Sequence, residues 1–188
     1  SIQLELEIGQ VKLLKNKGRI PGNTGTIFDT TELSPTEDIF YRFNLYWPLK
    51  GKSSLRFLYG PLEINQRGNF SKDVLFEGET FLKSTKTDVF YKFNSYRLSY
   101  RYLWIDGPSY KTYIGFTGKI RDAEIKLSQS GLSKSNTNVG FVPLFYLRGD
   151  WSAKDWLTFI FEMDALGGSK GRAIEGVLKG RVRVNNDL

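Results

Sequence analysis

Paired carboxylates are the residues of this sequence that could do chemistry. Glu162 and Asp164 lie two positions apart, as do Glu5 and Glu7. If each pair lies on a strand, its two side chains share one face, because strand side chains alternate between faces. Neighbouring carboxylates can act as general acid and base or bind calcium. They can also neutralise nearby arginines, and we favour this role.

The composition excludes several kinds of active site. The chain contains no histidine and no cysteine, which rules out histidine triads, histidine or thiolate metal sites, and disulfides. Barrel enzymes that modify membrane lipids typically use a histidine. The glycine-rich residues 167–171 lack the spacing of a phosphate-binding loop, so they predict a turn. We therefore expect no enzymatic activity, no metal and no cofactor.

The net charge of the chain is positive but dispersed. The 188 residues include 27 bases and 20 acids, which gives a formal charge of +7. A basic protein can bind nucleic acid or an anionic lipid surface. Because the bases form no continuous run, we do not expect a nucleic-acid site. The distribution indicates charges that are solvated or paired inside a fold.

The segment 93–104 shows what kind of element positions these charges. From position 96 to 104 the even-numbered residues are Tyr, Leu, Tyr, Tyr and Trp. The odd-numbered residues Ser95, Arg97, Ser99 and Arg101 are polar. A period of two predicts a strand with one aromatic face and one polar face. When this pattern recurs along a chain, it is typical of an outer-membrane barrel.

The alternation does recur, and the links between the strands differ in length. We expect strands at about residues 2–8, 37–47, 55–65, 88–105, 110–127, 138–151, 157–164 and 174–184. Long polar links are expected at 15–35, 68–87 (with a possible hairpin) and 128–137, and short turns at 48–53, 106–109, 152–155 and 167–171. Long external loops that alternate with short periplasmic turns are typical of membrane barrels.

These observations predict one all-β domain over residues 1–188. We expect an antiparallel up-and-down transmembrane β-barrel of about eight strands, with ten as the alternative count. No helical pattern is longer than about two turns, and no apolar run approaches the roughly 20 residues that a spanning helix needs. A search for long apolar runs does not detect membrane-spanning strands, because their lipid-facing residues alternate with lumen-facing ones.

In such a barrel the polar face of each strand points inward. The ionisable residues assigned to it are Glu5, Glu7, Arg42, Arg56, Arg97, Arg101, Lys119, Arg121, Glu162, Asp164, Glu175, Lys179, Arg181 and Arg183. These charges must pair, because an unpaired buried charge costs several kcal/mol. The interior of an eight-stranded barrel is about wide enough for its own side chains. We therefore predict a lumen plugged by paired charges.

Aromatic residues gather beside the expected short turns. They are Trp47, Tyr102, Trp104, Tyr110, Trp151 and Trp156, and they include all four tryptophans of the chain. Tyr and Trp favour membrane interfaces because their rings are apolar and their polar tips stay wet. The sequence thus predicts an aromatic girdle at the periplasmic rim.

Several local strings resemble a family of bacterial outer-membrane β-barrel proteins of unassigned activity. They are RIPGNTGTIF at 19–28, RFLYGPL at 56–62, FNSYRLSYRY at 93–102, KIRDAEI at 119–125 and NVGFVP at 138–143. The strings together span most of the chain, although none is a chemical motif. The resemblance implies a precursor with a signal peptide and an outer-membrane location.

The sequence departs from such barrels at one point. Their last strand usually ends in an aromatic residue, whereas this sequence ends with VNNDL at 184–188. The expectation is therefore either an eight-stranded closure without that ending, or a further hairpin that the sequence lacks.

We expect a non-enzymatic outer-membrane barrel that acts as an envelope scaffold, or as a binder through its external loops. Lipopolysaccharide and phospholipid are its expected partners, and a protein partner is unknown. One alternative is a small transporter or pore for a lipid or an anion, because the inward set holds nine bases and five acids.

A soluble lipocalin-like barrel that binds a lipid is the other alternative. It would direct its apolar face inward, and periodicity alone does not distinguish inside from outside. Two features count against it. The polar face carries few charges for a surface in water, and the apolar face is too bulky to leave a cavity.

Overall fold

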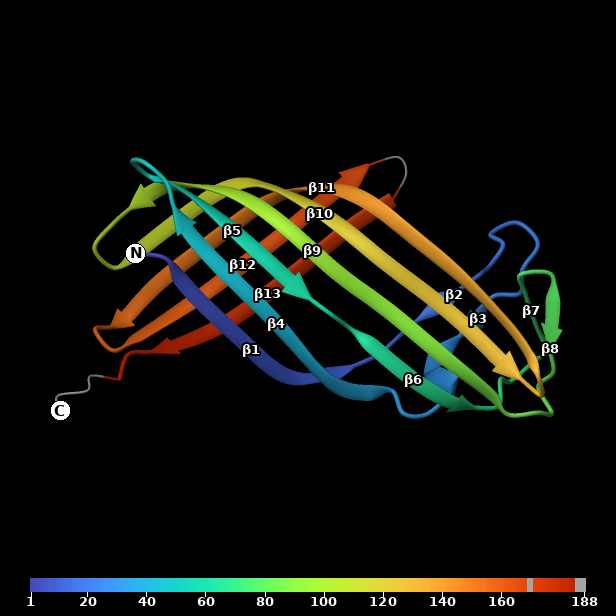
Figure 1. The fold of residues 1–188 in the computed structure, drawn as a ribbon. Coiled ribbons are helices and arrows are strands. Elements are labelled where there is room, and N and C mark those ends of the chain that lie inside the picture. The colour runs from blue at the N-terminus through green and yellow to red at the C-terminus, as the bar shows by residue number, and fades with distance from the viewer. Residues whose placement is uncertain (169–170, 185–188) are drawn as a thin grey trace.

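A computed structural model describes residues 1–168 and 171–184, and its main feature is one antiparallel β-sheet (Figure 1). The path through this sheet is β1-β4-β5-β9-β10-β11-β12-β13. The strands are β1 (Gln3–Lys12), β4 (Glu37–Pro48), β5 (Ser53–Gly60), β9 (Thr87–Asp106), β10 (Tyr110–Gln129), β11 (Leu132–Lys154), β12 (Leu157–Gly168) and β13 (Gly171–Val182). Neighbours in the sheet follow chain order, so the predicted all-β up-and-down arrangement is confirmed.

One predicted strand is divided in two. Residues 55–65 were expected to be continuous, but β5 ends at Gly60 and β6 (Glu63–Gly68) begins after Pro61. Both segments pair with β9. Proline has no N–H to donate to a ladder, which explains why the strand is interrupted there. The two segments occupy one place in the sheet, so the path still has eight positions.

The expected closed barrel is not what the structure shows. The sheet curls, but within the described residues no hydrogen-bonded ladder joins β1 to β13. Side chains span the two edges instead. Lys179 Nζ of β13 lies 2.5 Å from Glu5 Oε1 and 2.7 Å from Glu7 Oε1, both on β1. The edges are therefore neighbours that are joined by ion pairs and not by backbone hydrogen bonds.

The polarity of the sheet is the reverse of that in a water-soluble protein. Leu4 and Leu178 on the outer face are each 83% exposed, and Phe116 is 62% exposed. On the inner face Arg56 is 2% exposed and Thr117 is also 2% exposed. The sheet thus has an apolar outside and a polar inside.

Aromatic rings stack across neighbouring strands on the outer face. The ring centroids of Phe43 and Tyr59 are 6.2 Å apart, and those of Tyr59 and Tyr96 are 4.9 Å apart. Direct cross-strand partners of this kind help to fix strand register. The stacks therefore hold β4, β5 and β9 in the register that directs their arginines inward.

The two ends of the curled sheet differ. Three short turns, between β4 and β5, β9 and β10, and β11 and β12, lie at the end that also holds the N-terminus (Figure 1). We call this the turn end. The long connections after β1 and β6 lie at the opposite end, which we call the loop end. No helix in the described part of the chain is long and apolar enough to cross a membrane.

The prediction of a polar loop at residues 128–137 is wrong. β10 and β11 continue through this region and meet in a tight turn at Ser130 and Gly131, whose φ angles are 47° and 83°. Two residues with positive φ are typical of a hairpin turn whose twist matches that of its strands. The polar side chains lie on an extended hairpin, because strand pairing uses backbone hydrogen bonds and tolerates Ser, Thr and Asn side chains.

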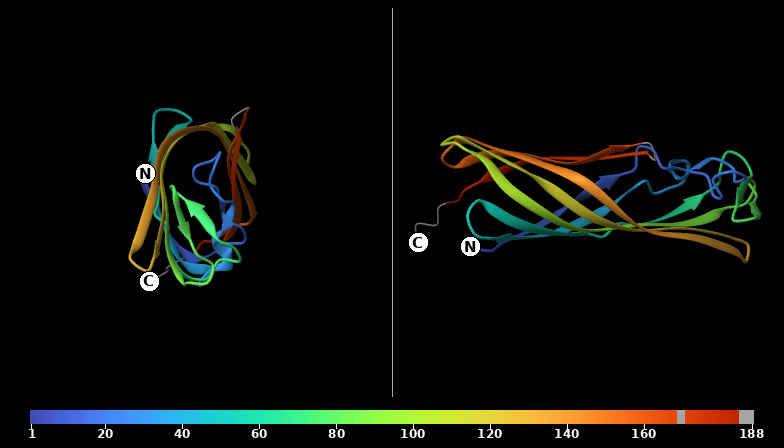
Figure 2. Two further views of the ribbon diagram at one scale, coloured as in Figure 1. Left: turned by 90° about the vertical axis from the view of Figure 1, so that its right-hand side faces the viewer. Right: turned by 90° about the horizontal axis from the view of Figure 1, so that it is seen from above.

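The two long connections fold into a cap with its own hydrophobic core. The first contains β2 (Lys17–Gly18), β3 (Phe28–Asp29) and the short 3-10 helix η1 (Thr30–Glu32), and the second contains the hairpin of β7 (Val74–Phe76) and β8 (Glu79–Phe81). We call residues 13–36 and 69–86 the loop-end cap. In the end-on view of Figure 2 it lies in front of the curled sheet.

The cap core packs on the far ends of β9 and β10. It consists of Phe28, Leu33, Phe70, Val74, Phe76, Phe81, Val89 and Leu127. Gln129 of β10 fastens the cap to the sheet, since its side chain accepts a 2.8 Å hydrogen bond from Leu82 N and donates to the Leu82 and Thr85 carbonyls. The main apolar core is therefore in the cap and not inside the sheet.

Two sequence expectations reach beyond the described residues. The turn at 167–171 includes residues 169–170, and the C-terminal string at 184–188 includes residues 185–188. Both predictions therefore lie partly outside the described residues.

Gly115 of β10 tests the close packing of β9 against β10. A Cβ added there would overlap the carbonyl oxygen of Tyr100, whereas a Cβ at Gly149 of β11 would meet nothing within 4 Å. We expect Gly115→Ala to lower the free energy of unfolding by about 1–3 kcal/mol, the usual cost of overpacking. Urea unfolding in detergent micelles measures this change.

Gly149→Ala is the matched control and should leave the unfolding midpoint unchanged or slightly higher. Equal midpoints for the two variants would contradict the packing of β9 on β10 described above.

Candidate functional site

The charged residues inside the sheet form one connected network. At its centre Arg56 of β5 faces Glu162 and Asp164 of β12. Arg56 Nη1 lies 3.3 Å from Glu162 Oε2, and Arg56 Nη2 lies 3.3 Å from Asp164 Oδ2. The exposed fractions of these side chains are only 2–5%. The two carboxylates therefore share one buried guanidinium that comes from the opposite wall.

Arg97 of β9 extends the network toward β13. Its Nη1 donates a 2.8 Å hydrogen bond to Asp164 Oδ2, and its Nη2 bonds to Glu175. Arg42 of β4 also reaches Glu175, at 3.0 Å. Lys119 Nζ lies 4.0 Å from the same carboxylate. Glu175 thus joins three different strands to β13.

Asp164 has a further neutral partner in the interior. Thr117 Oγ1 donates a 2.7 Å hydrogen bond to Asp164 Oδ1 and lies 2.7 Å from Ser99 Oγ. Lys179 connects the network to β1 through Glu5 and Glu7. We call this set of ion pairs and hydrogen bonds the lumen network.

Arg148 of β11 is a member of the network that the sequence did not reveal. It forms a bidentate pair with Asp150 at 2.5 and 2.8 Å and a 2.8 Å hydrogen bond to Glu162. Tyr146 also donates to Glu162, at 3.0 Å. The available signal was position: Leu144, Tyr146 and Arg148 alternate along one strand, but two of the three are apolar or aromatic and hide the polar face.

Four of the fourteen predicted inward residues lie outside the network. The expectation that Arg101 pairs with a lumen carboxylate is wrong, since among the described residues no acid forms an ion pair with it. Its guanidinium lies over tyrosine rings instead. Arg121 bonds to Asn138. Arg181 and Arg183 are exposed at the turn end, where β13 leaves the sheet.

The network leaves almost no space around its charges. The cavity lined by Arg56, Arg97, Glu162, Asp164 and their neighbours has a volume of only about 10 Å³. A water molecule needs roughly 10–15 Å³ of such space. The central carboxylate oxygens are engaged by cations or hydroxyls, so the chemistry that this geometry supports is mutual neutralisation.

The predicted girdle residues are exposed near the turn end. Trp47, Tyr102, Trp104, Tyr110, Trp151 and Trp156 are between 41% and 60% exposed. Each lies on, or next to, a strand end that leads into one of the three short turns. The structure thus brings them to the same end of the sheet, on its outside.

No protein-family model matches the chain, and no curated protein or solved structure shows significant similarity to it. The local resemblance to outer-membrane proteins therefore gains no support from these comparisons. A functional proposal has to come from the geometry.

Glu162 provides the sharpest test of the network. It contacts Arg56, Arg148 and the Tyr146 hydroxyl while only 4% exposed. Replacing it with Gln removes one of the two acids that pair with Arg56 and one of the two that pair with Arg148, so we expect Glu162→Gln to lower the free energy of unfolding by about 3 kcal/mol or more. Urea unfolding in micelles measures the change.

Glu37→Gln is the matched control, because Glu37 pairs with Lys12 at 2.6 Å on the surface, where the side chains are 41% and 60% exposed. An exposed pair contributes about 0–1 kcal/mol. If Glu162→Gln cost no more than Glu37→Gln, the lumen charges would be solvated and the network would not be a plug.

Proposed function

We propose that this protein is a non-enzymatic barrel of the bacterial outer membrane, with an interior plugged by the lumen network. In this role it acts as an envelope scaffold, and the loop-end cap supplies a rigid surface for binding. Outer-membrane lipid surrounds the sheet.

Reversed polarity is the observation that carries the proposal. Contiguous apolar patches on soluble monomers rarely exceed a few hundred Å², yet here apolar side chains are exposed along whole strands while arginines are buried. A bilayer explains both, because lipid solvates the outer face and the strands shield the charges from it. This reversal also argues against the soluble lipid-binding alternative, which requires an apolar interior.

In a membrane the open edge between β1 and β13 has to be satisfied. Unpaired backbone groups in hydrocarbon cost several kcal/mol each, so only closed sheets cross a bilayer. Lys179 already holds Glu5 and Glu7 across this edge. We propose that in lipid β13 pairs with β1 and completes the barrel at this seam.

The second candidate function is transport of a lipid or an anion. Its support is the excess of bases among the inward residues, and its difficulty is the filled interior around Glu162. Recording in planar bilayers separates the two functions. A steady conductance of porin size would favour the transport function over the scaffold function.

Site-specific labelling tests the membrane proposal directly, because the chain has no native cysteine. Leu98 points outward and is 46% exposed, whereas the adjacent Ser99 points inward and is 0% exposed. In proteoliposomes we expect Leu98→Cys to react with a lipid-dissolved maleimide and Ser99→Cys to stay unlabelled. The substitution at 99 is nearly isosteric, so the fold should tolerate it.

Labelling of both variants after unfolding in urea confirms that each thiol is intact. Equal labelling of the two folded variants, or the reverse order, would end the membrane proposal.

A further inference from the structure

A basic cavity opens at the turn end, on the far side of the lumen network from the cap. Its volume is about 450 Å³, within the roughly 300–1,000 Å³ range of small-molecule sites. The three short turns and the end of β13 surround it. We call it the turn-end cavity.

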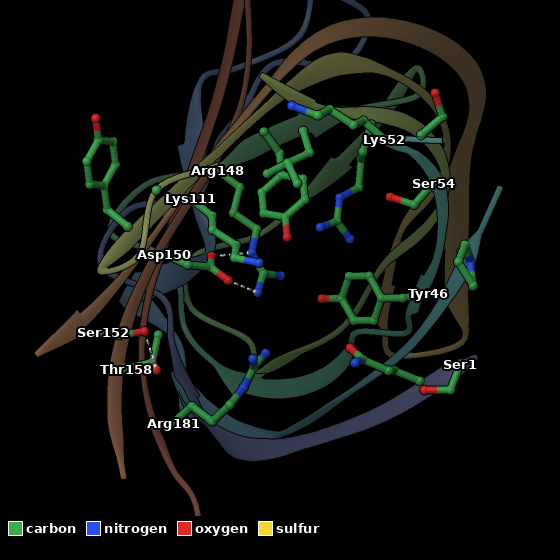
Figure 3. A pocket seen from close by; sticks show the side chains of 18 of the residues that line it. Ser1, Tyr46, Lys52, Ser54, Lys111, Arg148, Asp150, Ser152, Thr158 and Arg181 are labelled. Atoms are coloured by element: carbon green, nitrogen blue, oxygen red, sulfur yellow. Dashed lines mark hydrogen bonds and ion pairs between the residues drawn. The ribbon is translucent and has the colours of Figure 1, made fainter. Parts of the chain in front are cut away.

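Charge in this cavity is strongly one-sided. Six bases line it, namely Lys52, Arg101, Lys111, Arg148, Arg181 and Arg183, and the one lining carboxylate in the described residues is Asp150. Asp150 is already held by Arg148 (Figure 3). Clustered bases in a concave, partly dry site raise the local concentration of anions.

Arg101 is the residue that most strongly indicates a binding site in this cavity. It is 5% exposed, lines the cavity, and has a buried Nε without a hydrogen-bond partner. No carboxylate in the described residues neutralises it. Its guanidinium carbon lies 4.8 Å from the centre of the Tyr46 ring and 4.7 Å from that of Tyr113, so cation–π contacts fix its position.

Tyr46 provides a second, independent sign of a ligand. It is 8% exposed, and its hydroxyl also lacks a partner in the described protein. Figure 3 shows this hydroxyl directed into the middle of the cavity. Burying the Tyr46 hydroxyl and the Arg101 Nε–H without partners costs free energy, and an anion held between them would recover it.

We infer that the turn-end cavity binds a phosphate group. Planar guanidinium groups match phosphate oxygens in bidentate geometry, and the Tyr46 hydroxyl can donate to a third oxygen. Arg101 is the anchor at the base of the cavity, and Arg181 and Arg183 attract the anion at its rim. The phosphate comes either free from solution or on a lipid headgroup, since exposed tryptophans surround this end.

This inference goes beyond the scaffold role and does not depend on it. A phosphate site in the cavity requires only the arrangement of these side chains. Loss of phosphate binding would therefore leave the membrane proposal intact. Failure of the membrane proposal would likewise leave the phosphate site intact.

Titration calorimetry of the full chain in a non-ionic detergent tests the site with two probes: inorganic phosphate, and dihexanoyl phosphatidic acid below its micelle concentration. We expect saturable binding of at least one probe. Binding of inorganic phosphate would identify a free anion as the ligand, and binding of the lipid alone would identify a headgroup. Absence of saturable binding for both would overturn the inference.

Variants locate the binding. Arg101→Gln should weaken it about tenfold or more, because a charge-assisted hydrogen bond is lost. Arg181→Gln combined with Arg183→Gln should weaken phosphate binding at least about threefold. These two residues are exposed and form no ion pair in the described structure, so the double variant should fold. It therefore tests the site even if Arg101→Gln does not fold.

Lys72→Gln combined with Lys86→Gln is the matched control at the loop end. It removes the same charge from two exposed positions and should change the affinity less than about twofold. If the control weakened binding as much as the rim variant does, the effect would be general charge and the cavity would not be a site. Unchanged affinity in folded Arg101→Gln would equally overturn the inference.

Discussion

Charge neutralisation inside the curled sheet is the constraint on which the rest of the structure depends. Arg56 and Arg97 are almost completely buried, and an uncompensated charge in such a place costs several kcal/mol. Their partners Glu162 and Asp164 lie on β12, across the interior. The pairs therefore decide which strands face each other. They also explain why the sheet curls so far that β13 meets β1 through Lys179.

The protein separates two kinds of stabilisation in space. Ion pairs and hydrogen bonds fill the middle of the sheet, and the loop-end cap holds a conventional apolar core around Phe76 and Phe81. Gln129 connects the two regions. A polar interior with an apolar exterior suits lipid, while a cap with a buried core suits water. If the protein lies in a membrane, as we propose, each region carries the surface that suits its surroundings.

The sequence was a good guide to the strands and a partial guide to the site. Alternation such as that around Leu98 and Arg97 predicted strand positions and the two faces, because both depend only on the period of two. It could not identify Arg148, which follows two apolar or aromatic inward residues. It wrongly paired Arg101, since the partner of an inward arginine depends on register and height across strands that are distant in sequence.

The turn-end cavity was beyond sequence reasoning for the same reason. It requires Tyr46, Arg101 and Arg148, from β4, β9 and β11, to meet at one height. Closure of the barrel was overestimated because alternation describes single strands and not the spacing between the first and the last. The prediction of a loop at 128–137 was wrong because polar composition alone does not distinguish a loop from a paired hairpin.

Tryptophan fluorescence in liposomes can show whether the apolar outer face lies in a bilayer. All four tryptophans, Trp47, Trp104, Trp151 and Trp156, are exposed on the outside near the turn end. We expect strong quenching by lipids brominated near the glycerol backbone and weaker quenching by lipids brominated near the chain ends. Fluorescence that neither lipid quenches, in protein that floats with the liposomes, would contradict the membrane proposal.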